Sequence, residues 1–385
     1  MAVVRLIDIC EKIGSGATPR GGKEAYCNEG ISLVRSQNVL DFAFSRNGLA
    51  YINDDQAKKL SNVEMQQDDV LLNITGDSVA RACMMDSACL PARVNQHVAI
   101  IRGKKNSVIS SYILYFLQWK KQYLLQLASA GATRNALTKG MIEQLVIDLP
   151  SLEDQKRIVS ILDSLQRKIQ LNQEINDNLQ QQAQALFRAW FVDFLPFGKI
   201  MPSDWTVSTL GQVSDMGAGG DKPKTTSPIK TDECPYPIFS NGLSDYGLYG
   251  YTNEAKIYDE SVTVSARGTI GFVCLRHVPY VPIVRLVTLI PHTELLSAKY
   301  LYLYLRQLNI SGTGTTQQQL TVPDFRKTEI LLPGKAAMDS FTELITPMFE
   351  KIWANEEESA SLAKFRDALL PKLMSGEIDV SNIQL

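Results

Sequence analysis

Polar side chains that suit nucleic-acid recognition occur in corresponding loops of both halves of the sequence. Asn and Gln can pair with adenine and Arg with guanine in the major groove, while Thr and Lys suit phosphates. An ordinary loop role is the simpler interpretation of any single residue, but the repeated sets favour recognition of a DNA duplex. The candidates are Thr18, Arg20, Lys23, Ser36, Gln37, Asn38, Arg81, Asn95, Gln96, His97, Thr133, Arg134, Asn135, Lys222, Lys224, Ser240, Asn241, Arg267, Thr269, Thr315, Thr316, Gln317, Gln318 and Gln319.

Catalytic motifs are scarce by comparison. Residues 16–23 approach a phosphate-binding loop, but Lys23 falls one position late and Glu24 replaces the metal-binding Ser or Thr, which favours a polar turn. No N-P-P-Y or D-P-P-Y segment marks an amino-methyltransferase. Asp245, Glu254 and Lys256 resemble a fragment of a metal-dependent nuclease, so a nuclease remains an alternative. We expect no catalytic residue, metal site or cofactor on this chain.

Composition indicates an ordinary globular protein. Of 385 residues, 45% are hydrophobic and 21% are charged, which excludes a disordered chain. The net charge of −2 gives no general support for nucleic-acid binding, although residues 1–150 carry 17 basic against 14 acidic side chains. No apolar run reaches the ~18 residues of a membrane span, so a cytoplasmic location is expected. The six cysteines form no C-x-x-C pair and are expected to be free thiols.

An internal repeat organises the chain. Matched segments follow one another in the same order in two halves, which is hard to obtain by chance. Apolar runs predict strands at 31–34, 70–74, 98–101 and 284–290, and helices at 112–127 and 299–308. The matches pair residues 6–9 with 210–213, Gly14-x-Gly16 with Gly217-x-Gly219, 68–70 with 259–261, 76–83 with 267–274, 111–117 with 299–305, and 131–138 with 314–321.

Each half ends in Leu-Pro and leads into a helical segment. Apolar residues at alternating spacings of four and three form a coiled-coil seam in both segments. The asparagines in this seam either fix the register of the helix pair or face water. Pro347 predicts a kink or a late start in the second helix. The seam comprises Ile158, Leu162, Leu165, Ile169, Asn172, Leu179, Leu186, Phe341, Ile345, Met348, Ile352, Asn355, Leu362 and Leu369.

The repeat and the helices together predict an α+β architecture. Two similar mixed α/β target-recognition domains, 1–150 and 195–333, would be separated by long helices over 151–194 and 334–385. Because the second helix begins where the second domain ends, burial of both apolar stripes requires an antiparallel pair with pseudo-two-fold symmetry. A structural coiled-coil spacer whose end domains bind protein is a second alternative.

Several motifs resemble the specificity subunit of Type I restriction–modification systems over essentially the whole chain. Residues 149–158 (LPSLEDQKRI) are similar to that family's Leu-Pro-x-Leu-x-x-Gln-x-x-Ile segment at the start of the first helix. Residues 201–205 (MPSDW), followed by Leu210-Gly211, are similar to its Pro-x-x-Trp…Leu-Gly segment, and 369–378 (LLPKLMSGEI) to its C-terminal end. Gly14 to Pro19 matches its Gly-x-Thr-Pro opening, whereas the second helix lacks the Leu-x-x-Gln pattern.

The resemblance implies a non-catalytic, DNA-recognising subunit. Each domain would read one half of a split, asymmetric target, and the helices would set the spacing between the halves. The chain would bind two modification subunits, which carry S-adenosylmethionine and methylate adenine. Through them it would bind a restriction subunit that uses ATP and Mg²⁺.

Overall fold

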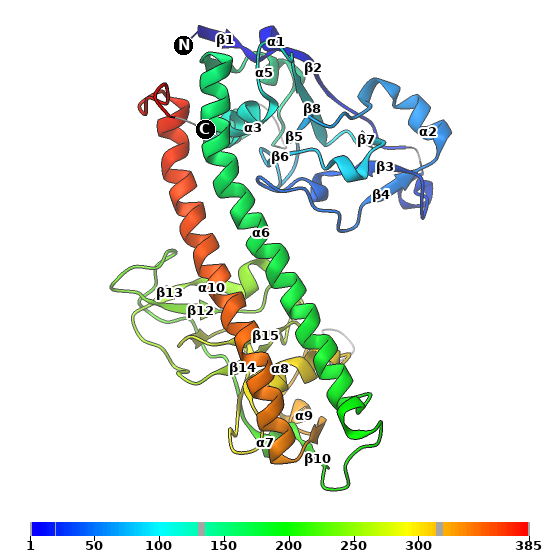
Figure 1. Ribbon diagram of the computed structural model, residues 1–385, viewed down its shortest axis with the longest axis vertical. Helices are drawn as coiled ribbons and strands as arrows, with labels where there is room; N and C mark the ends of the chain where they lie inside the picture. Colours follow the sequence, from blue (N-terminus) through cyan, green and yellow to red (C-terminus); the bar gives the residue numbers. More distant parts are fainter. Residues whose placement is uncertain (1, 20, 130–134, 313–318, 384–385) are drawn as a thin grey trace. The chain divides into compact units, whose positions relative to one another are not determined.

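The chain forms two compact units. The computed structural model describes residues 2–19, 21–129, 135–312 and 319–383, without the side chains of residues 22 and 23 (Figure 1). Unit 1 comprises Met1–Asn172 and Glu357–Leu385, and unit 2 comprises Gln173–Glu356. Each unit therefore includes half of each long helix, whereas the sequence-based division assigns the helices to segments of their own.

Strands and short helices alternate in both units. Unit 1 contains β1 (Ala2–Arg5), α1 (Leu6–Ile9), β2 (Cys10–Ser15), β3 (Ile31–Val34), β4 (Ala50–Ile52), α2 (Asp54–Lys59), β5 (Val70–Asn73), β6 (Ala82–Met84), β7 (Ala92–Val94), β8 (Val98–Gly103), α3 (Ser110–Trp119), α4 (Lys121–Ser129), α5 (Lys139–Glu143) and β9 (Val146–Leu149). Unit 2 contains β10 (Thr206–Thr209), α7 (Leu210–Val213), β11 (Ser214–Ala218), β12 (Tyr236–Phe239), β13 (Leu248–Thr252), β14 (Ser261–Val264), β15 (Val273–Arg276), β16 (Val281–Pro282), β17 (Val287–Pro291), α8 (Ala298–Gln307), α9 (Val322–Phe325) and β18 (Glu329–Leu332). The long helices are α6 (Leu152–Phe191) and α10 (Lys335–Met374).

The two units have the same sheet topology, which confirms the internal repeat. A four-stranded antiparallel sheet has the order β2-β8-β5-β6 in unit 1 and β11-β17-β14-β15 in unit 2. A three-stranded sheet, β4-β3-β7 or β13-β12-β16, combines one antiparallel and one parallel pair in each unit. A two-stranded ribbon pairs β1 with β9 and β10 with β18.

Two pairs of matched residues make the same contacts in both units. The buried Tyr112 donates its hydroxyl to the Asp148 carbonyl at 3.0 Å, and its counterpart Tyr300 donates to the Leu331 carbonyl at 2.7 Å. Thr138 caps α5 and Thr321 caps α9 by accepting a backbone N–H three residues later. The alignment of the two halves is therefore correct at the level of single hydrogen bonds.

The second glycine of each Gly-x-Gly motif is required by close backbone packing. A Cβ on Gly16 would lie 1.8 Å from the Val94 carbonyl oxygen, and one on Gly219 would lie 2.7 Å from the Ile283 nitrogen. At Gly14 and Gly217 a Cβ would meet nothing within 4 Å among the described residues. Only the second glycine is thus needed to bring the chain past the three-stranded sheet.

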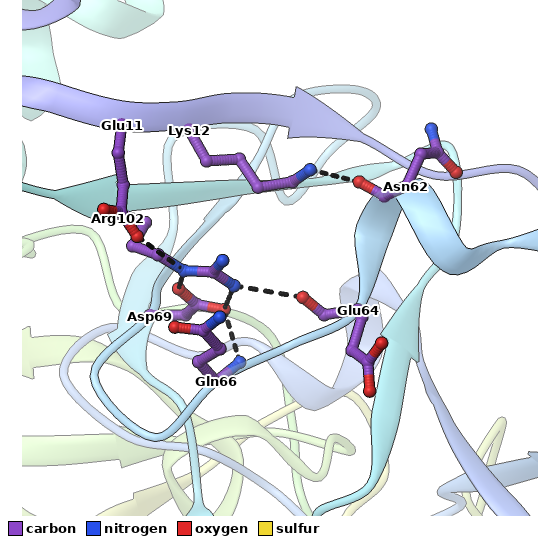
Figure 2. Close-up of polar contacts among 7 residues, drawn as sticks. All are labelled: Glu11, Lys12, Asn62, Glu64, Gln66, Asp69 and Arg102. Atoms are coloured by element: carbon purple, nitrogen blue, oxygen red, sulfur yellow. Dashed lines mark hydrogen bonds and ion pairs between the residues drawn. The ribbon is translucent and has the colours of Figure 1, made fainter.

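A buried ion pair fixes the start of β5 in unit 1 (Figure 2). Arg102 of β8 donates Nε and Nη2 to the two carboxylate oxygens of Asp69, at 2.6 and 2.7 Å. Asp69 also accepts the backbone N–H of Gln66 at 2.7 Å, and Arg102 donates to the Glu64 carbonyl at 3.0 Å. In unit 2 the matched acid Glu260 instead accepts from Lys299 of α8, at 2.9 Å. The acidic position is repeated, but its cation comes from a different element.

The halves of α6 and α10 pack antiparallel within each unit (Figure 1). In unit 1, Arg366 donates to Gln166 at 2.5 Å and Asn172 donates to Ser359 at 3.2 Å. In unit 2, the Phe191 and Phe341 rings lie 4.7 Å apart, and Asn355 donates to Asn176 at 2.8 Å. Partner numbers fall along α10 as they rise along α6, which confirms the predicted antiparallel direction.

The predicted seam residues lie on the inward faces of these helices, and none of them is exposed. Asn172 and Asn355 are each 1% exposed and hydrogen-bonded across the helix pair, so the interpretation that they face water is wrong. Phe187 and Phe191, which we did not assign to the seam, are also buried there. Buried seam residues are Ile158, Leu162, Asn172, Phe341, Ile345, Ile352 and Asn355, and half-buried ones are Leu165, Ile169, Leu179, Leu186, Met348, Leu362 and Leu369.

Three local predictions are corrected. α10 begins at Lys335, so Pro347 causes no late start; it lies on the exposed face, where water can solvate the carbonyl that loses its partner. The helix predicted at 112–127 is two helices, α3 and α4, with Lys120 between them. The strand predicted at 284–290 begins only at Val287, because Val284 and Arg285 form a turn.

All six cysteines are free, as predicted. Burial raises the pKa of the Cys10 thiol to about 12 and also raises the pKa of Cys83 and Cys274. These thiols therefore remain protonated and unreactive. Within the described residues, no helix is both long and apolar enough to span a membrane.

Gln155, the glutamine of the Leu-Pro-x-Leu-x-x-Gln segment, anchors the start of α6. Its buried side chain accepts the Ile109 N–H at 2.9 Å and donates to the carbonyls of Pro150 and Ser107, at 3.1 and 3.3 Å. It thereby joins the loop before α3 to the first turn of α6. The matched position in α10 is the buried Met338, which packs in the core of unit 2 instead.

We predict that Gln155→Ala lowers the free energy of unfolding by about 2–4 kcal/mol, because one buried and two half-buried backbone groups lose their partner. Chemical denaturation monitored by circular dichroism measures this change. The exposed Gln173 of α6 is a matched control, and Gln173→Ala should stay within about 0.5 kcal/mol. Equal stability of the two variants would show that Gln155 does not hold the start of the helix.

Candidate nucleic-acid interface

The loops that carry most of the candidates in unit 1 meet at one edge of the four-stranded sheet. β2 and β5 end at this edge and β8 begins there, since Ser15 pairs with Ala99 and Asn73 pairs with Val98. Backbone hydrogen bonds join the loops: Gly16 donates to Asn95 at 3.1 Å, Ile74 to His97 at 2.9 Å, and Gly76 to Asn135 at 3.2 Å. Segments distant in sequence are thereby brought together.

A polar network covers this edge in unit 1. Thr18 donates its hydroxyl to Gln96 Oε1, and Gln96 Nε2 lies 3.1 Å from His97 Nε2. Since the amide nitrogen Nε2 of Gln96 can only donate, His97 Nε2 accepts, and the Nδ1–H of His97 donates to Thr75 Oγ1 at 2.5 Å. The Thr75 hydroxyl proton is then left to donate outward. Sequence reasoning missed Thr75, although it directly precedes the predicted loop glycine Gly76.

The same edge exists in unit 2. β11 and β14 end there and β17 begins there, because Ala218 and Val264 both pair with Val287. Leu320 donates to the Ala266 carbonyl at 3.0 Å, as Leu137 donates to the Ile74 carbonyl at 2.8 Å in unit 1. The backbone at this edge is therefore arranged alike in the two units, while the side chains that the edge carries differ.

Arginines dominate the edge of unit 2. The exposed Arg267 donates from Nε and Nη2 to Gln319 Oε1, at 3.3 and 3.1 Å. Arg267, Gln319 and Arg285 line a cavity of about 390 Å³ together with Thr321. Arg285 was missed because it lies within an apolar run that reads as a strand.

The turn that contains Arg285 is strained. Val284 and Arg285 have φ angles of 55° and 59°, in the left-handed region that costs a non-glycine residue about 1–2 kcal/mol. Positive φ is least favourable for a β-branched residue such as Val284. Asn241 holds the turn by donating to the Val284 carbonyl and accepting the Ala266 N–H, both at 2.7 Å.

Several candidates have structural roles instead. Asn38 is 0% exposed; its Oδ1 accepts the Arg35 N–H at 3.0 Å and its Nδ2 donates to the Ser45 carbonyl at 2.9 Å. The buried Asn95 accepts the His97 N–H at 3.0 Å. Together with Asn241, these asparagines hold loop backbones and have little remaining capacity to bind bases.

The other candidates occupy loop positions with fewer contacts. Gln37 is exposed and donates to the Gly48 carbonyl at 3.1 Å, while Ser36 and Ser240 are half-buried. Lys222 and Lys224 are exposed, with Lys222 Nζ 5.0 Å from the centre of the Tyr249 ring. Arg81 and Thr269 are half-buried and Asn135 is exposed. Outside the described residues or side chains lie Arg20, Lys23, Thr133, Arg134, Thr315, Thr316, Gln317 and Gln318.

The residues of the alternative nuclease site are not gathered around a common point. Asp245 lines a cavity of about 750 Å³ with Tyr246, Tyr302 and Glu356, and burial raises the pKa of Glu356. Glu254 and Lys256 do not line this cavity, and Lys256 Nζ lies instead beside Gly220. Among the described side chains, no group of three or more His, Cys, Asp or Glu residues could hold a metal ion.

Comparisons with known proteins support recognition. The family described as Type I restriction modification DNA specificity domain matches residues 1–181 and 202–346. The MjaIX specificity subunit of Methanocaldococcus jannaschii is 25% identical over 99% of this chain and 94% of its own length. The HindI specificity subunit of Haemophilus influenzae is 24% identical over 92% of this chain and 95% of its own length.

A solved structure shares the fold. The S subunit of a Type I restriction–modification system from M. genitalium aligns with a TM-score of 0.60 at 13% identity, covering 97% of this chain and 96% of that one. The family match confirms the resemblance found in the sequence motifs and favours DNA recognition over a nuclease or a purely structural spacer. The chain therefore belongs to the family of Type I restriction–modification DNA specificity subunits.

Proposed function

We propose that each unit reads one part of a split DNA target with the loops at the edge of its four-stranded sheet. The observation that carries this proposal is that both units contain this edge, with matched backbone hydrogen bonds but different side chains. Unit 1 presents Gln96 and His97, whereas unit 2 presents Arg267 and Gln319. Because Gln suits adenine and Arg suits guanine, the two parts of the target differ in sequence.

Exposed lysines near these edges would contact phosphates and so position the duplex without selecting its sequence. Lys222 and Lys224 follow the Gly219 loop and are exposed. The charge available for this purpose is small, because residues 195–333 contain 12 basic and 12 acidic side chains. The chain alone would therefore bind DNA weakly, and partner subunits would strengthen the complex.

The duplication also suggests the number of partners. Two modification subunits, carrying S-adenosylmethionine and methylating adenine, would each bind one copy of the repeated structure. A restriction subunit that uses ATP and Mg²⁺ would join through them, so these cofactors belong to the partners and none to this chain. The assembly would act on cellular DNA in the cytoplasm.

The long helices would set the distance between the two parts of the target. α6 and α10 each run for 40 residues without interruption, and each contributes to both units. At 1.5 Å per residue, 40 helical residues extend about 60 Å. Such a continuous element could fix the number of unread base pairs.

We predict that a helix deletion shortens the gap in the target. Removal of residues 166–172 and 359–365, which lie opposite each other in the antiparallel pair, takes out one heptad and preserves the seam. The loss of about 10 Å should shorten the methylated motif by roughly three base pairs. Sequencing of methylated genomic DNA measures the gap, and an unchanged gap in a folded, active variant would contradict the spacer role.

We predict that assembly strengthens DNA binding and that binding falls steeply with salt. Gel shifts at about 50 and 200 mM salt, with and without the modification subunit, should show much tighter binding by the assembled complex. Lys224→Ala should weaken binding to all sequences and reduce the salt dependence by about one counterion. The exposed Lys351 on α10 provides a control of equal charge. Equal affinity with and without the partner would contradict the proposal.

A further inference from the structure

A short turn joins the two larger sheets in each unit and lies at the proposed DNA-binding edge. In unit 1 it connects β7 to β8, with Gln96 and His97 at its centre and a 3.4 Å hydrogen bond from the Val98 N–H to the Asn95 carbonyl. In unit 2 it connects β16 to β17, with Val284 and Arg285 at its centre and the bond from Leu286 to Ile283 at 3.1 Å. The repeat therefore places Arg285 where unit 1 has His97.

The backbone of the turn in unit 2 is fixed from several sides. Val284 N–H donates to the Gly220 carbonyl at 2.9 Å, and Arg285 N–H donates to the Gly219 carbonyl at 2.8 Å. Asn241 holds the Val284 carbonyl as well. These bonds maintain a left-handed conformation at two consecutive non-glycine residues, which an unconstrained chain would leave.

The side chain that this turn presents is available for binding. The Arg285 side chain is exposed, and its guanidinium makes no hydrogen bond or ion pair within the described part of the chain. It differs in this respect from Arg267, which is held by Gln319 on the same cavity wall. All N–H donors of the Arg285 guanidinium therefore remain available to a ligand.

We infer that the Val284–Arg285 turn is the main base-reading element of unit 2 and that Arg285 recognises a guanine in the major groove. The inference rests on the proposed function of the sheet edge. A phosphate contact needs no fixed backbone, because a flexible Lys or Arg on any loop supplies it. A strained, anchored turn gains its value only when the direction of the side chain matters, as it does for a bidentate contact to guanine O6 and N7.

The test compares the motifs methylated by assembled complexes. Wild type, Arg285→Ala and Arg285→Gln are each expressed with the modification subunit in a host without adenine methylation, and modified adenines are mapped across the genome. Arg285→Ala should reduce discrimination at one G·C position of one half of the motif by roughly 10- to 100-fold, leaving the other half unchanged. Arg285→Gln should shift the preference at that position toward A·T. Lys351→Ala, which removes an exposed charge from α10, should change nothing.

The outcomes separate this inference from the proposed function. A wild-type motif without two separated parts would overturn the proposed function itself. A split wild-type motif that Arg285→Ala leaves intact would overturn only the role of Arg285. Uniformly weaker methylation of an unchanged motif would identify Arg285 as a phosphate contact and would also overturn base reading.

A second variant tests the strain directly. Val284→Asn replaces a β-branched residue with one that tolerates the left-handed region, so the melting temperature should rise by roughly 2–4 °C. Thermal unfolding followed by circular dichroism measures the change. An unchanged or lower melting temperature would overturn the inference that the turn is held under strain to present Arg285.

Discussion

Burial of the apolar faces of α6 and α10 is the interaction on which both units depend. In unit 1, Ile158 and Leu162 of α6 share a core with Leu370 and Leu373 of α10. In unit 2, Phe187 and Phe191 share a core with Phe341 and Ile345. Unit 1 therefore consists of two separate stretches of chain, since it needs the last part of α10 to complete its core. Unit 2 is one continuous stretch, but its core needs the second half of α6, which precedes the second domain in the sequence. Hydrogen-bonded asparagines within the seam hold the antiparallel register that this burial requires.

Comparison of the two units shows which features of the repeat are constant and which vary. The order of the strands, the caps at Thr138 and Thr321, and the close packing at Gly16 and Gly219 are the same in both units. The side chains at the sheet edge differ, from a Thr–Gln–His network in unit 1 to an arginine-rich cavity in unit 2. A constant scaffold with variable loops allows one fold to present two different recognition surfaces.

The sequence predicted the helix pair and the repeat better than it predicted the side chains at the edge of each four-stranded sheet. The heptad pattern and the second glycine of each Gly-x-Gly motif are local signals of packing, and the structure explains both of them. The type of a polar residue did not show whether it is available to bind DNA or holds a loop backbone. Asn38 and Asn241 hold loop backbones, and only their tertiary surroundings distinguish them from an exposed polar residue. Arg285 lies in an apolar run, and its turn is fixed by hydrogen bonds that Val284 and Arg285 donate to the carbonyls of Gly220 and Gly219, which lie far away in sequence. The two units could not be delimited either, because contacts between opposite ends of α6 and α10 decide them.

The map of adenines methylated across a genome by this chain and its modification subunit tests the central claim most directly. Two sequence-reading edges with unlike side chains predict a motif of two specified parts, different from each other and divided by a constant number of unread base pairs. A single uninterrupted motif, or two parts with identical sequence, would contradict the claim that the duplicated sheet edges read the DNA.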